Sequence, residues 1–389
     1  MNRFLMAFFL AFLALSSPVL AQSRAFEVSG WIPTWRSATG TAEALAHLPL
    51  FTEVNPFSYT VKSDGTIAKT QLFDGEPWAT LAITSRSQKV RFIPTVAWSD
   101  GAAIHRILSN AKTRRALADE IAMLVREKNW DGIDIDFENK RAETRPYFSL
   151  FLQGLQTRLG SKKWLMCTIE ARTPVSSRYT KKIPKDATNY ANDFKQIAKW
   201  CDRVRIMTYD QGTIDVKLNA DALGPYMPNA DIKWVEKVMK LALADIPKKK
   251  LVMGIPTYGS EYEVTPFTNG GYEYDRLWSF NPRYAVDLTA SLNIPPTRNQ
   301  AGELSFVYTP KSAVSSADSL DTTTGTAVST SSATGEGSFS TTTPFRLLWW
   351  SDAQAIADKV ALAKKLGIRG VAVFKIDGGA DPNMWGLLP

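Results

Sequence analysis

Residues 131 to 138 read Asp-Gly-Ile-Asp-Ile-Asp-Phe-Glu, and apolar and acidic side chains alternate strictly from Ile133 to Glu138. A repeat of two residues predicts a β-strand whose successive side chains point to opposite faces. Asp134, Asp136 and Glu138 then share one face, with neighbouring carboxyl groups roughly 7 Å apart. Like charges at this spacing raise one another's pKa and destabilise the fold. Because an ordinary solvated strand mixes acidic with basic or neutral side chains, this strand predicts a functional site.

Short apolar runs that predict strands alternate along the chain with stretches that have the apolar spacing of helices. The eight predicted strands are 26–35, 54–61, 90–98, 133–138, 164–171, 203–209, 251–258 and 370–376. The predicted helices are 41–47, 104–128, 147–159, 187–200, 232–243 and 353–366. This alternation predicts an α/β fold, the (β/α)8 or TIM barrel. Since such barrels carry their active sites at the C-terminal ends of the strands, we expect Glu138 at the open end, with Asp134 and Asp136 inside the barrel.

The long gap between the seventh and eighth strands predicts an insertion at 261–346, between strand 7 and helix 7. The barrel then comprises residues 22–260 and 347–389. Within the insertion, Asn281-Pro282 is expected to begin a helix and 304–309 to form a strand, so both α and β elements are predicted. Residues 311–343 contain 18 Ser or Thr among 33 positions. We interpret this part as a flexible stretch, with a Thr-rich β-hairpin as the alternative.

Residues 1–21 have the features of a secretory signal peptide, with Arg3 before the apolar run 4–15 and small residues near position 21. They predict an exported protein that is secreted, periplasmic or associated with the cell wall; a retained membrane anchor is the alternative. No second apolar run is long enough to span a bilayer. The formal net charge of +8 weakly favours an anionic polymer as partner, and the lack of a dense basic run argues against nucleic acid.

The chain contains two cysteines and two histidines. Cys167 and Cys201 lie in or beside apolar segments, so two buried thiols are favoured over a disulfide. With only His47 and His105, a His-rich zinc site is excluded and a Ser-His-Asp triad is disfavoured. We expect neither a metal nor another cofactor, although a cluster of carboxylates could instead hold a divalent cation.

The motif Asp-Gly-x-Asp-x-Asp-x-Glu resembles the catalytic motif of glycoside hydrolase family 18. That family includes chitinases, endo-β-N-acetylglucosaminidases and peptidoglycan-cleaving enzymes of the spore-cortex-lytic type. Met-Thr-Tyr-Asp at 207–210 and Gly-Ile-Pro-Thr-Tyr-Gly at 254–259 resemble the sixth and seventh strands of the family. Further short matches resemble the bacterial cortex-lytic branch, at 224–225, 234–235 and 348–356. The resemblance covers about residues 26–389, and it implies that the insertion is a small α+β subdomain.

The resemblance implies a retaining hydrolysis in which the acetamido group of the substrate attacks its own anomeric carbon and forms an oxazolinium ion. It assigns Glu138 as general acid and later base, with a pKa raised by the neighbouring acids. Asp136 would accept a hydrogen bond from the acetamido N–H, and Asp134 would share a proton with Asp136. Tyr209 would donate to the acetamido oxygen, and Asp210 would support the pocket.

Aromatic side chains near strand ends are candidates for stacking on sugar rings, with core packing as the alternative for each of them. Trp31 and Tyr258 are the first candidates, and Trp98 is another. Many family members carry a Trp on the eighth strand as the floor of the cleavage subsite. Here Phe374 stands at that position with Lys375 beside it, which argues against specialisation for crystalline chitin.

Together these features favour an exported, monomeric glycosidase that cleaves β-1,4 bonds beside N-acetylglucosamine. Peptidoglycan strands or their fragments are favoured as substrate over chitin oligomers, because of the cortex-lytic resemblance and the positive charge. One alternative is a non-catalytic, lectin-like barrel of the same family, which the presence of Glu138 disfavours. Another is a metal-dependent hydrolase.

Overall fold

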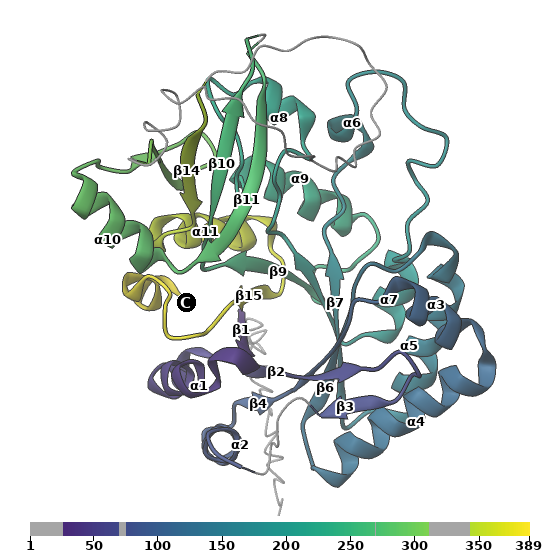
Figure 1. Cartoon of the computed structure of the whole chain (residues 1–389). Coiled ribbons are helices and arrows are strands. Elements are labelled where there is room, and N and C mark those ends of the chain that lie inside the picture. The colour runs from purple at the N-terminus through teal and green to yellow at the C-terminus, as the bar shows by residue number, and fades with distance from the viewer. Residues whose placement is uncertain (1–25, 70–74, 269, 311–342) are drawn as a thin grey trace, which may run out of the picture.

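Eight parallel strands form a closed barrel in the computed structural model, which describes residues 26–69, 75–268, 270–310 and 343–389 (Figure 1). The barrel strands are β1 (Glu27–Pro33), β2 (Glu53–Val61), β5 (Thr95–Trp98), β6 (Gly132–Phe137), β7 (Trp164–Glu170), β8 (Arg203–Met207), β9 (Leu251–Pro256) and β15 (Gly370–Phe374). Strand β1 pairs in parallel with both β2 and β15, which closes the ring. The predicted (β/α)8 barrel is therefore confirmed.

Helices surround this barrel (Figure 1). The longer ones are α1 (Ser37–Ala46), α2 (Trp78–Ser87), α3 (Gly101–Ser109), α4 (Ala111–Glu127), α5 (Arg145–Leu159), α7 (Phe194–Trp200), α9 (Ile232–Leu243) and α11 (Ala353–Leu366). Two shorter helices are α6 (Val175–Arg178) and α8 (Val216–Ala220). The predictions for 232–243 and 353–366 agree with α9 and α11 residue for residue. None of the described helices combines the length and the apolar composition needed to cross a bilayer.

Three predicted elements differ from the structure because local capping or proline interrupts them. The single helix expected at 104–128 is two helices, since the Asn110 side chain accepts hydrogen bonds from the Lys112 and Thr113 amides and caps α4. The helix expected at 187–200 begins only after Asp193, which caps α7 in the same way. The strand expected at 90–98 is divided around Pro94 into β4 (Arg91–Phe92) and β5. Helix α2 and the short β3 (Ile67–Lys69), which pairs antiparallel with β2, were not predicted.

The alternation that defines β6 also builds the core. Ile133, Ile135 and Phe137 are completely buried on the outer face of the strand. The Phe137 ring stacks on Phe151 of α5 at a centroid distance of 5.4 Å. Burying each of these side chains contributes about 1.5–3 kcal/mol to stability. The apolar half of the octet therefore fixes β6 against its helices and leaves the acidic half pointing inward.

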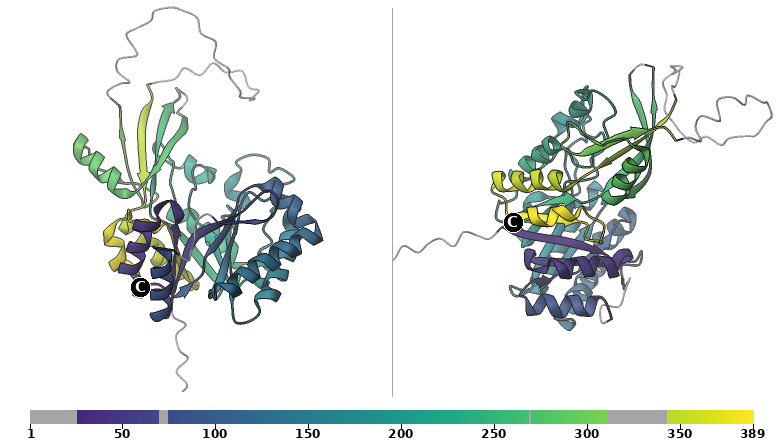
Figure 2. Two further views of the ribbon diagram at one scale, coloured as in Figure 1. Left: turned by 60° about the horizontal axis from the view of Figure 1, so that its bottom comes forward. Right: turned by 90° about the vertical axis from the view of Figure 1, so that its left-hand side faces the viewer.

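The insertion is a five-stranded antiparallel sheet with one helix, and it projects from the barrel (Figure 2). Its elements are β10 (Gly259–Pro266), β11 (Tyr272–Phe280), α10 (Pro282–Leu292), β12 (Thr297–Arg298), β13 (Leu304–Tyr308) and β14 (Phe345–Trp350). Helix α10 begins after Asn281, and β13 agrees with the predicted strand. The sheet extends slightly beyond the predicted bounds, to Gly259 and Trp350. The signal peptide at 1–21 and nearly all of the Ser/Thr-rich stretch lie outside the described residues, so both stay predictions.

Buried Glu303 fastens the insertion to the barrel. Its carboxylate accepts hydrogen bonds from the Asn229 amide at 2.9 Å, from Trp349 Nε1 at 2.8 Å and from Ser351 Oγ at 2.6 Å. Lys359 Nζ of α11 lies 3.6 Å from Glu303 Oε1, and both side chains are almost completely buried. These hydrogen bonds and the charge of Lys359 offset the cost of burying the Glu303 carboxylate between the insertion and the barrel.

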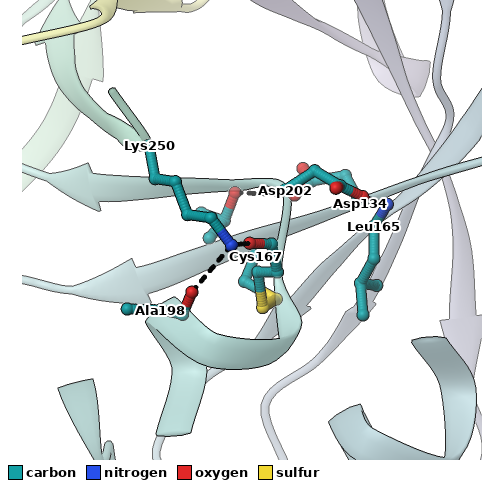
Figure 3. The surroundings of a disulfide bond; sticks show 8 residues. Asp134, Leu165, Cys167, Ala198, Asp202 and Lys250 are labelled. Carbon is teal, nitrogen blue, oxygen red and sulfur yellow. Dashed lines mark hydrogen bonds between the residues drawn. A yellow bond between two sulfur atoms is a disulfide. The ribbon is translucent and has the colours of Figure 1, made fainter. Parts of the chain in front are cut away.

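Cys167 and Cys201 form a disulfide, which corrects the prediction of two buried thiols (Figure 3). Cys167 lies on the outer face of β7, and Cys201 follows α7 directly before β8. The helix returns the chain to the side of β7, so the two Cα atoms lie 6.0 Å apart and both side chains are completely buried. Their apolar surroundings were predicted correctly, but their proximity depends on how α7 docks, which the sequence does not reveal. Lys250 Nζ closes this corner by donating to the carbonyl oxygens of Ala198 and Cys201.

Removing the disulfide should destabilise the fold. For the double variant Cys167→Ala/Cys201→Ala we predict a free energy of unfolding about 3–4 kcal/mol below that of the wild type, because a cross-link between residues 34 apart no longer restricts the unfolded chain. Urea unfolding followed by circular dichroism measures the difference. Reductant should shift the wild type towards the variant and leave the variant unchanged. Equal unfolding midpoints in the absence of reductant would contradict the prediction.

Candidate active site

Strand β6 carries its acidic face into the barrel and ends at the open rim. Asp134 and Asp136 are 0% and 3% exposed, whereas Glu138 directly follows the strand and is half-buried. The Glu138 amide donates to the Trp98 carbonyl oxygen at 2.7 Å, which continues the pairing of β5 with β6 one residue past the strand. The three carboxyl groups therefore occupy successive depths in the barrel interior.

Asp134, the deepest of the three, accepts hydrogen bonds at both carboxylate oxygens. Oδ2 accepts from Trp31 Nε1 at 2.9 Å, from Thr95 Oγ1 at 2.9 Å and from Arg205 Nη1 at 3.2 Å. Oδ1 accepts from Thr168 Oγ1 at 2.9 Å. A carboxylate, which only accepts, matches this set of donors. The surroundings of Asp134 therefore fix its position and its orientation.

Arg205 supplies the positive charge in this layer. Its side chain is completely buried, and its Nη2 lies 3.3 Å from Glu53 Oε1 and donates to Asn55 Oδ1 at 2.8 Å. The guanidinium also lies 5.1 Å from the centre of the Trp31 ring. One cation thus joins Asp134 to a second buried carboxylate, which offsets the desolvation of all three charges.

Asp136 has none of these partners. Its Oδ1 is buried and has no hydrogen-bond partner among the described residues. Burial, followed by the charges of Glu138 and Asp134, raises the pKa of Asp136 well above its usual range. This carboxyl group therefore keeps its proton to a higher pH than an exposed aspartate would, and one of its oxygens has no donor among the residues that the structure describes.

Glu138 lines a cavity of about 230 Å³ together with Glu170, Tyr209, Asp210 and Trp234. Burial and then the charge of Glu170 raise the pKa of Glu138, and Lys140 partly offsets this effect. Glu138 consequently keeps its proton to a higher pH than an exposed glutamate would, which suits a general acid.

Glu170, at the end of β7, is a site residue that the sequence reasoning missed. Its carboxylate accepts from the Asn139 amide at 2.8 Å and from Asn192 Nδ2 at 2.7 Å, and it lies 3.3 Å from Lys140 Nζ. Burial raises its pKa, but the charge of Lys140 and these hydrogen bonds outweigh burial and lower it overall. A carboxylate at the C-terminal end of a barrel strand was the available signal.

Tyr209 closes the cavity from the end of β8. Its ring stacks on Phe374 at 5.3 Å and meets the edge of Tyr258 at 6.4 Å. Burial and then the charge of Asp136 raise the pKa of the Tyr209 hydroxyl well above its usual range, so it remains a hydrogen-bond donor. Burial has the same effect on Tyr258, with the charge of Asp210 as the next cause.

Asp210 connects the barrel rim to the insertion. Its backbone has a φ of 52°, an uncommon conformation for a residue with a side chain, and its amide donates to Asn229 Oδ1 at 3.1 Å. Its half-exposed carboxylate lies 4.0 Å from Arg276 of β11. The turn therefore presents a carboxylate to the cavity beside Tyr209.

Two of the predicted sugar-stacking residues do not face the cavity. Trp31 is 1% exposed beneath the site, where it holds Asp134 and meets Phe374 edge-on at 6.0 Å. Trp98 lies on the outer face of β5, where it packs edge-on against Phe137 at 5.4 Å. The alternation along β5 explains this position, because Thr95 points inward to Asp134. Tyr258 is buried as well, so Phe374 is the one predicted stacking residue with a partly exposed ring.

The described residues contain no group of three or more His, Cys, Asp or Glu side chains arranged to hold a metal ion. Around Asp134 the neighbouring polar groups are donors, and Arg205 occupies the place where a cation would balance the carboxylates. Of the carboxyl groups in the site, Asp134, Glu170 and Asp210 have cationic partners, whereas Asp136 and Glu138 have none within ion-pair distance in the described part of the chain.

Comparison with known proteins agrees with this geometry. The family model described as glycosyl hydrolases family 18 matches residues 27–379. The cortical fragment-lytic enzyme of Bacillus anthracis is 24% identical over 94% of this chain and 74% of its own length. An uncharacterized glycosylase of Bacillus subtilis, YvbX, is 23% identical over 74% of this chain and 68% of its own.

Solved structures share the fold. The spore cortex-lytic enzyme SleL of Bacillus cereus has a TM-score of 0.68 at 23% identity, covering 94% of this chain and 74% of that one. A chitinase from Chromobacterium violaceum has a TM-score of 0.68 at 18% identity, covering 94% of this chain and 98% of that one.

Arg205→Gln should destabilise the barrel because it removes the cation that pairs with buried Asp134 and one of the two cations, with Arg91, that pair with buried Glu53. We predict a loss of about 3–5 kcal/mol in the free energy of unfolding, measured by urea denaturation. Arg115→Gln, on the exposed face of α4, is the matched control and should change stability by no more than about 0.5 kcal/mol. A loss for Arg205→Gln no larger than that of the control would contradict the role assigned to this residue.

Glu170→Gln should lower the pKa of Glu138. The substitution removes a negative charge that opposes ionisation of Glu138 and frees the positive charge of Lys140, and both effects favour the ionised form. NMR titration of selectively labelled glutamate side chains measures this shift. With Glu120→Gln as a distant control, an unchanged or raised pKa of Glu138 in Glu170→Gln would refute the prediction.

Proposed function

The chain belongs to glycosyl hydrolase family 18 and is a glycoside hydrolase, and we propose that it cleaves β-1,4 bonds beside N-acetylglucosamine with retention of configuration. The observation that carries this proposal is the buried oxygen of Asp136, unpartnered among the described residues, in a site with Glu138, whose pKa is raised, and the Tyr209 hydroxyl. An acetamido group supplies both an N–H for the first and a carbonyl oxygen for the last. Because the chain is a glycoside hydrolase of this family, an enzyme is favoured over the non-catalytic, lectin-like alternative.

In the first proposed step Glu138 transfers its proton to the glycosidic oxygen, and the bond between that oxygen and the anomeric carbon breaks. The acetamido oxygen of the same sugar forms a new bond to the anomeric carbon, and the positive charge spreads over the resulting oxazolinium ring. Water then forms a bond to the anomeric carbon from the opposite side, the bond between that carbon and the acetamido oxygen breaks, and the attacking water gives a proton back to Glu138. The raised pKa of Glu138 supports this cycle, because the group must be protonated when it starts.

Asp136 and Tyr209 hold the acetamido group in this scheme. Asp136 accepts the N–H at its free oxygen and stabilises the charge that develops there, while Tyr209 donates to the carbonyl oxygen. Because donors occupy both oxygens of Asp134, we assign the proton shared by Asp134 and Asp136 to Asp136 in the empty site. Binding of the sugar therefore requires this proton to leave or to turn away from the N–H.

Phe374 and Asp210 complete the proposed subsite. The partly exposed Phe374 ring forms its floor, stacked against Tyr209, and Asp210 supports the rim through Asn229 and Arg276. Tyr258 positions Tyr209 from the side. Trp31 acts through Asp134 rather than by touching sugar.

For the natural substrate we propose bacterial cell-wall glycan that contains N-acetylglucosamine, in preference to chitin oligomers. The cortical fragment-lytic relatives and the formal charge of +8 support this choice. We further propose that residues 1–21 export the protein and that it acts as a monomer in the periplasm, the cell wall or the medium.

The test is the variant Glu138→Gln, assayed on N-acetylglucosamine oligomers and on purified peptidoglycan. We predict that kcat falls by about 10²–10⁴-fold, the usual contribution of general acid catalysis, while the oligomers still bind. Glu127→Gln, at the exposed end of α4, serves as the control. Proton NMR of the first product measures the anomer, and retention predicts the β form.

Three results would oppose this proposal. Undiminished activity of Glu138→Gln would remove Glu138 as the acid, and an initial α anomer would exclude retention. Loss of wild-type activity in EDTA, restored by a divalent cation, would favour the metal-dependent alternative.

A further inference from the structure

A second cavity, of about 290 Å³, adjoins the one that contains Glu138. The two share four lining residues: Glu170, Ala171, Thr173 and Ile214. Its other wall comes from the long connection between β7 and α7, which carries α6 and lies on the right of Figure 1. A glycan bound at Glu138 could therefore extend into this space without crossing a barrier of buried protein.

Arg172 presents a fixed guanidinium to the second cavity. The group lies between the rings of Tyr190 and Phe194, at 3.7 and 3.9 Å from their centres, and Nη2 donates to the Asn192 carbonyl oxygen at 2.6 Å. It forms no ion pair with a carboxylate in the described part of the chain. Burial lowers the pKa of Arg172, and a bound anion would offset this effect.

The two acids whose charges act on Arg172 do not form ion pairs with it. Asp193 is paired with Arg145 at 3.1 Å and also caps α7, and Asp245 lies 3.8 Å from Lys195. Both influence Arg172 only through their charge. The guanidinium has five N–H donors and uses one of them in the hydrogen bond to Asn192.

Arg178 lines the same cavity from α6. Its Nη1 donates to the Ala187 carbonyl oxygen at 3.4 Å and its Nη2 to the Tyr179 hydroxyl at 3.1 Å, both neutral acceptors. Within the described ranges no carboxylate lies within ion-pair distance of it. Lys140 and Glu170, which also line the cavity, pair with each other. The positive charge of the two arginines therefore has no counterpart in the wall.

We propose that this cavity is a subsite for a carboxylate carried by the glycan, on a sugar next to the one held at Glu138. The inference rests on the proposed function and narrows its substrate to an anionic glycan. Arginine recognises a carboxylate through two parallel hydrogen bonds, and Asn189 adds a neutral polar group to the wall. Chitin carries no carboxylate, whereas N-acetylmuramic acid carries a lactyl group and an attached stem peptide carries others.

The test compares matched substrates in one enzyme preparation. The anionic substrate is an oligomer of alternating N-acetylglucosamine and N-acetylmuramic acid with free lactyl carboxylates, and the neutral substrate is the same oligomer with those carboxylates reduced to alcohols. A third oligomer, with stem peptides on the lactyl groups, distinguishes the two sources of carboxylate. The readout is the ratio of kcat/KM for each anionic oligomer to that for the neutral one, which does not depend on the folded fraction.

For the wild type we expect the anionic oligomer to be preferred at least about tenfold, and each of Arg172→Gln and Arg178→Gln to reduce this ratio about tenfold. The ratio for Arg172→Lys, which keeps the charge but loses the planar fork, should lie between that of the wild type and that of Arg172→Gln. Arg115→Gln, on the exposed face of α4, should leave the ratio unchanged. Added salt should lower the wild-type ratio.

A ratio that is the same in the wild type and both arginine variants would overturn the subsite. Failure of the proposed function has a different signature, namely no cleavage of any of the oligomers by the wild type. In that case calorimetric binding of the same oligomers to Glu138→Gln, with and without Arg172→Gln, decides the question. A carboxylate preference that disappears with Arg172→Gln supports the subsite, and equal affinity for the charged and reduced oligomers refutes it.

Discussion

The buried guanidinium of Arg205 is the interaction on which the barrel interior depends. Two carboxylates, Asp134 and Glu53, point into the same closed space, and each would be strongly unfavourable there without a cation. Arg205 lies within ion-pair distance of both and also donates to Asn55, and Arg91 is a second cation beside Glu53 at 2.6 Å. Trp31, Thr95 and Thr168 then satisfy the other lone pairs of Asp134. A rigid negative charge at this depth provides the foundation for the chemistry at the rim.

The site sorts its carboxyl groups by the partners that surround them. Asp134 and Glu170 each have a cation within about hydrogen-bond distance, from Arg205 and Lys140 respectively. Asp136 and Glu138 have no such cation among the described residues, and burial with the neighbouring negative charges raises the pKa of both. Burial and the neighbouring charges therefore favour the protonated forms of Asp136 and Glu138, a difference that four identical environments would not produce.

The alternation of side chains along a strand predicts correctly which residues of β5 and β6 point into the barrel and which point outward. It placed the apolar and acidic faces of β6 correctly, and applied to β5 it would have put Trp98 outside the barrel, because Thr95 points inward. It also puts Glu170 on the inner face of β7 with Thr168. Alternation does not show how deep in the barrel a side chain lies, so nothing in the sequence shows that Trp31 lies beneath the site rather than on its surface. The disulfide depends on the docking of α7, which no local pattern encodes.

In the proposed scheme, catalysis and the choice of substrate depend on different parts of the chain, the barrel strands and the connection between β7 and α7. The groups proposed to hold the acetamido group lie on or just beyond strands whose positions are fixed by core packing, so they can vary little without loss of the fold. Arg172 and Arg178 come from the β7–α7 connection, whose positive charge no carboxylate of the described chain neutralises. Keeping such a charge half-buried is unfavourable for the empty protein. This arrangement is therefore more easily explained by the negatively charged substrate that we propose than by stability, and such a subsite would separate an anionic cell-wall glycan from neutral chitin even though the two would react through the same carboxyl groups.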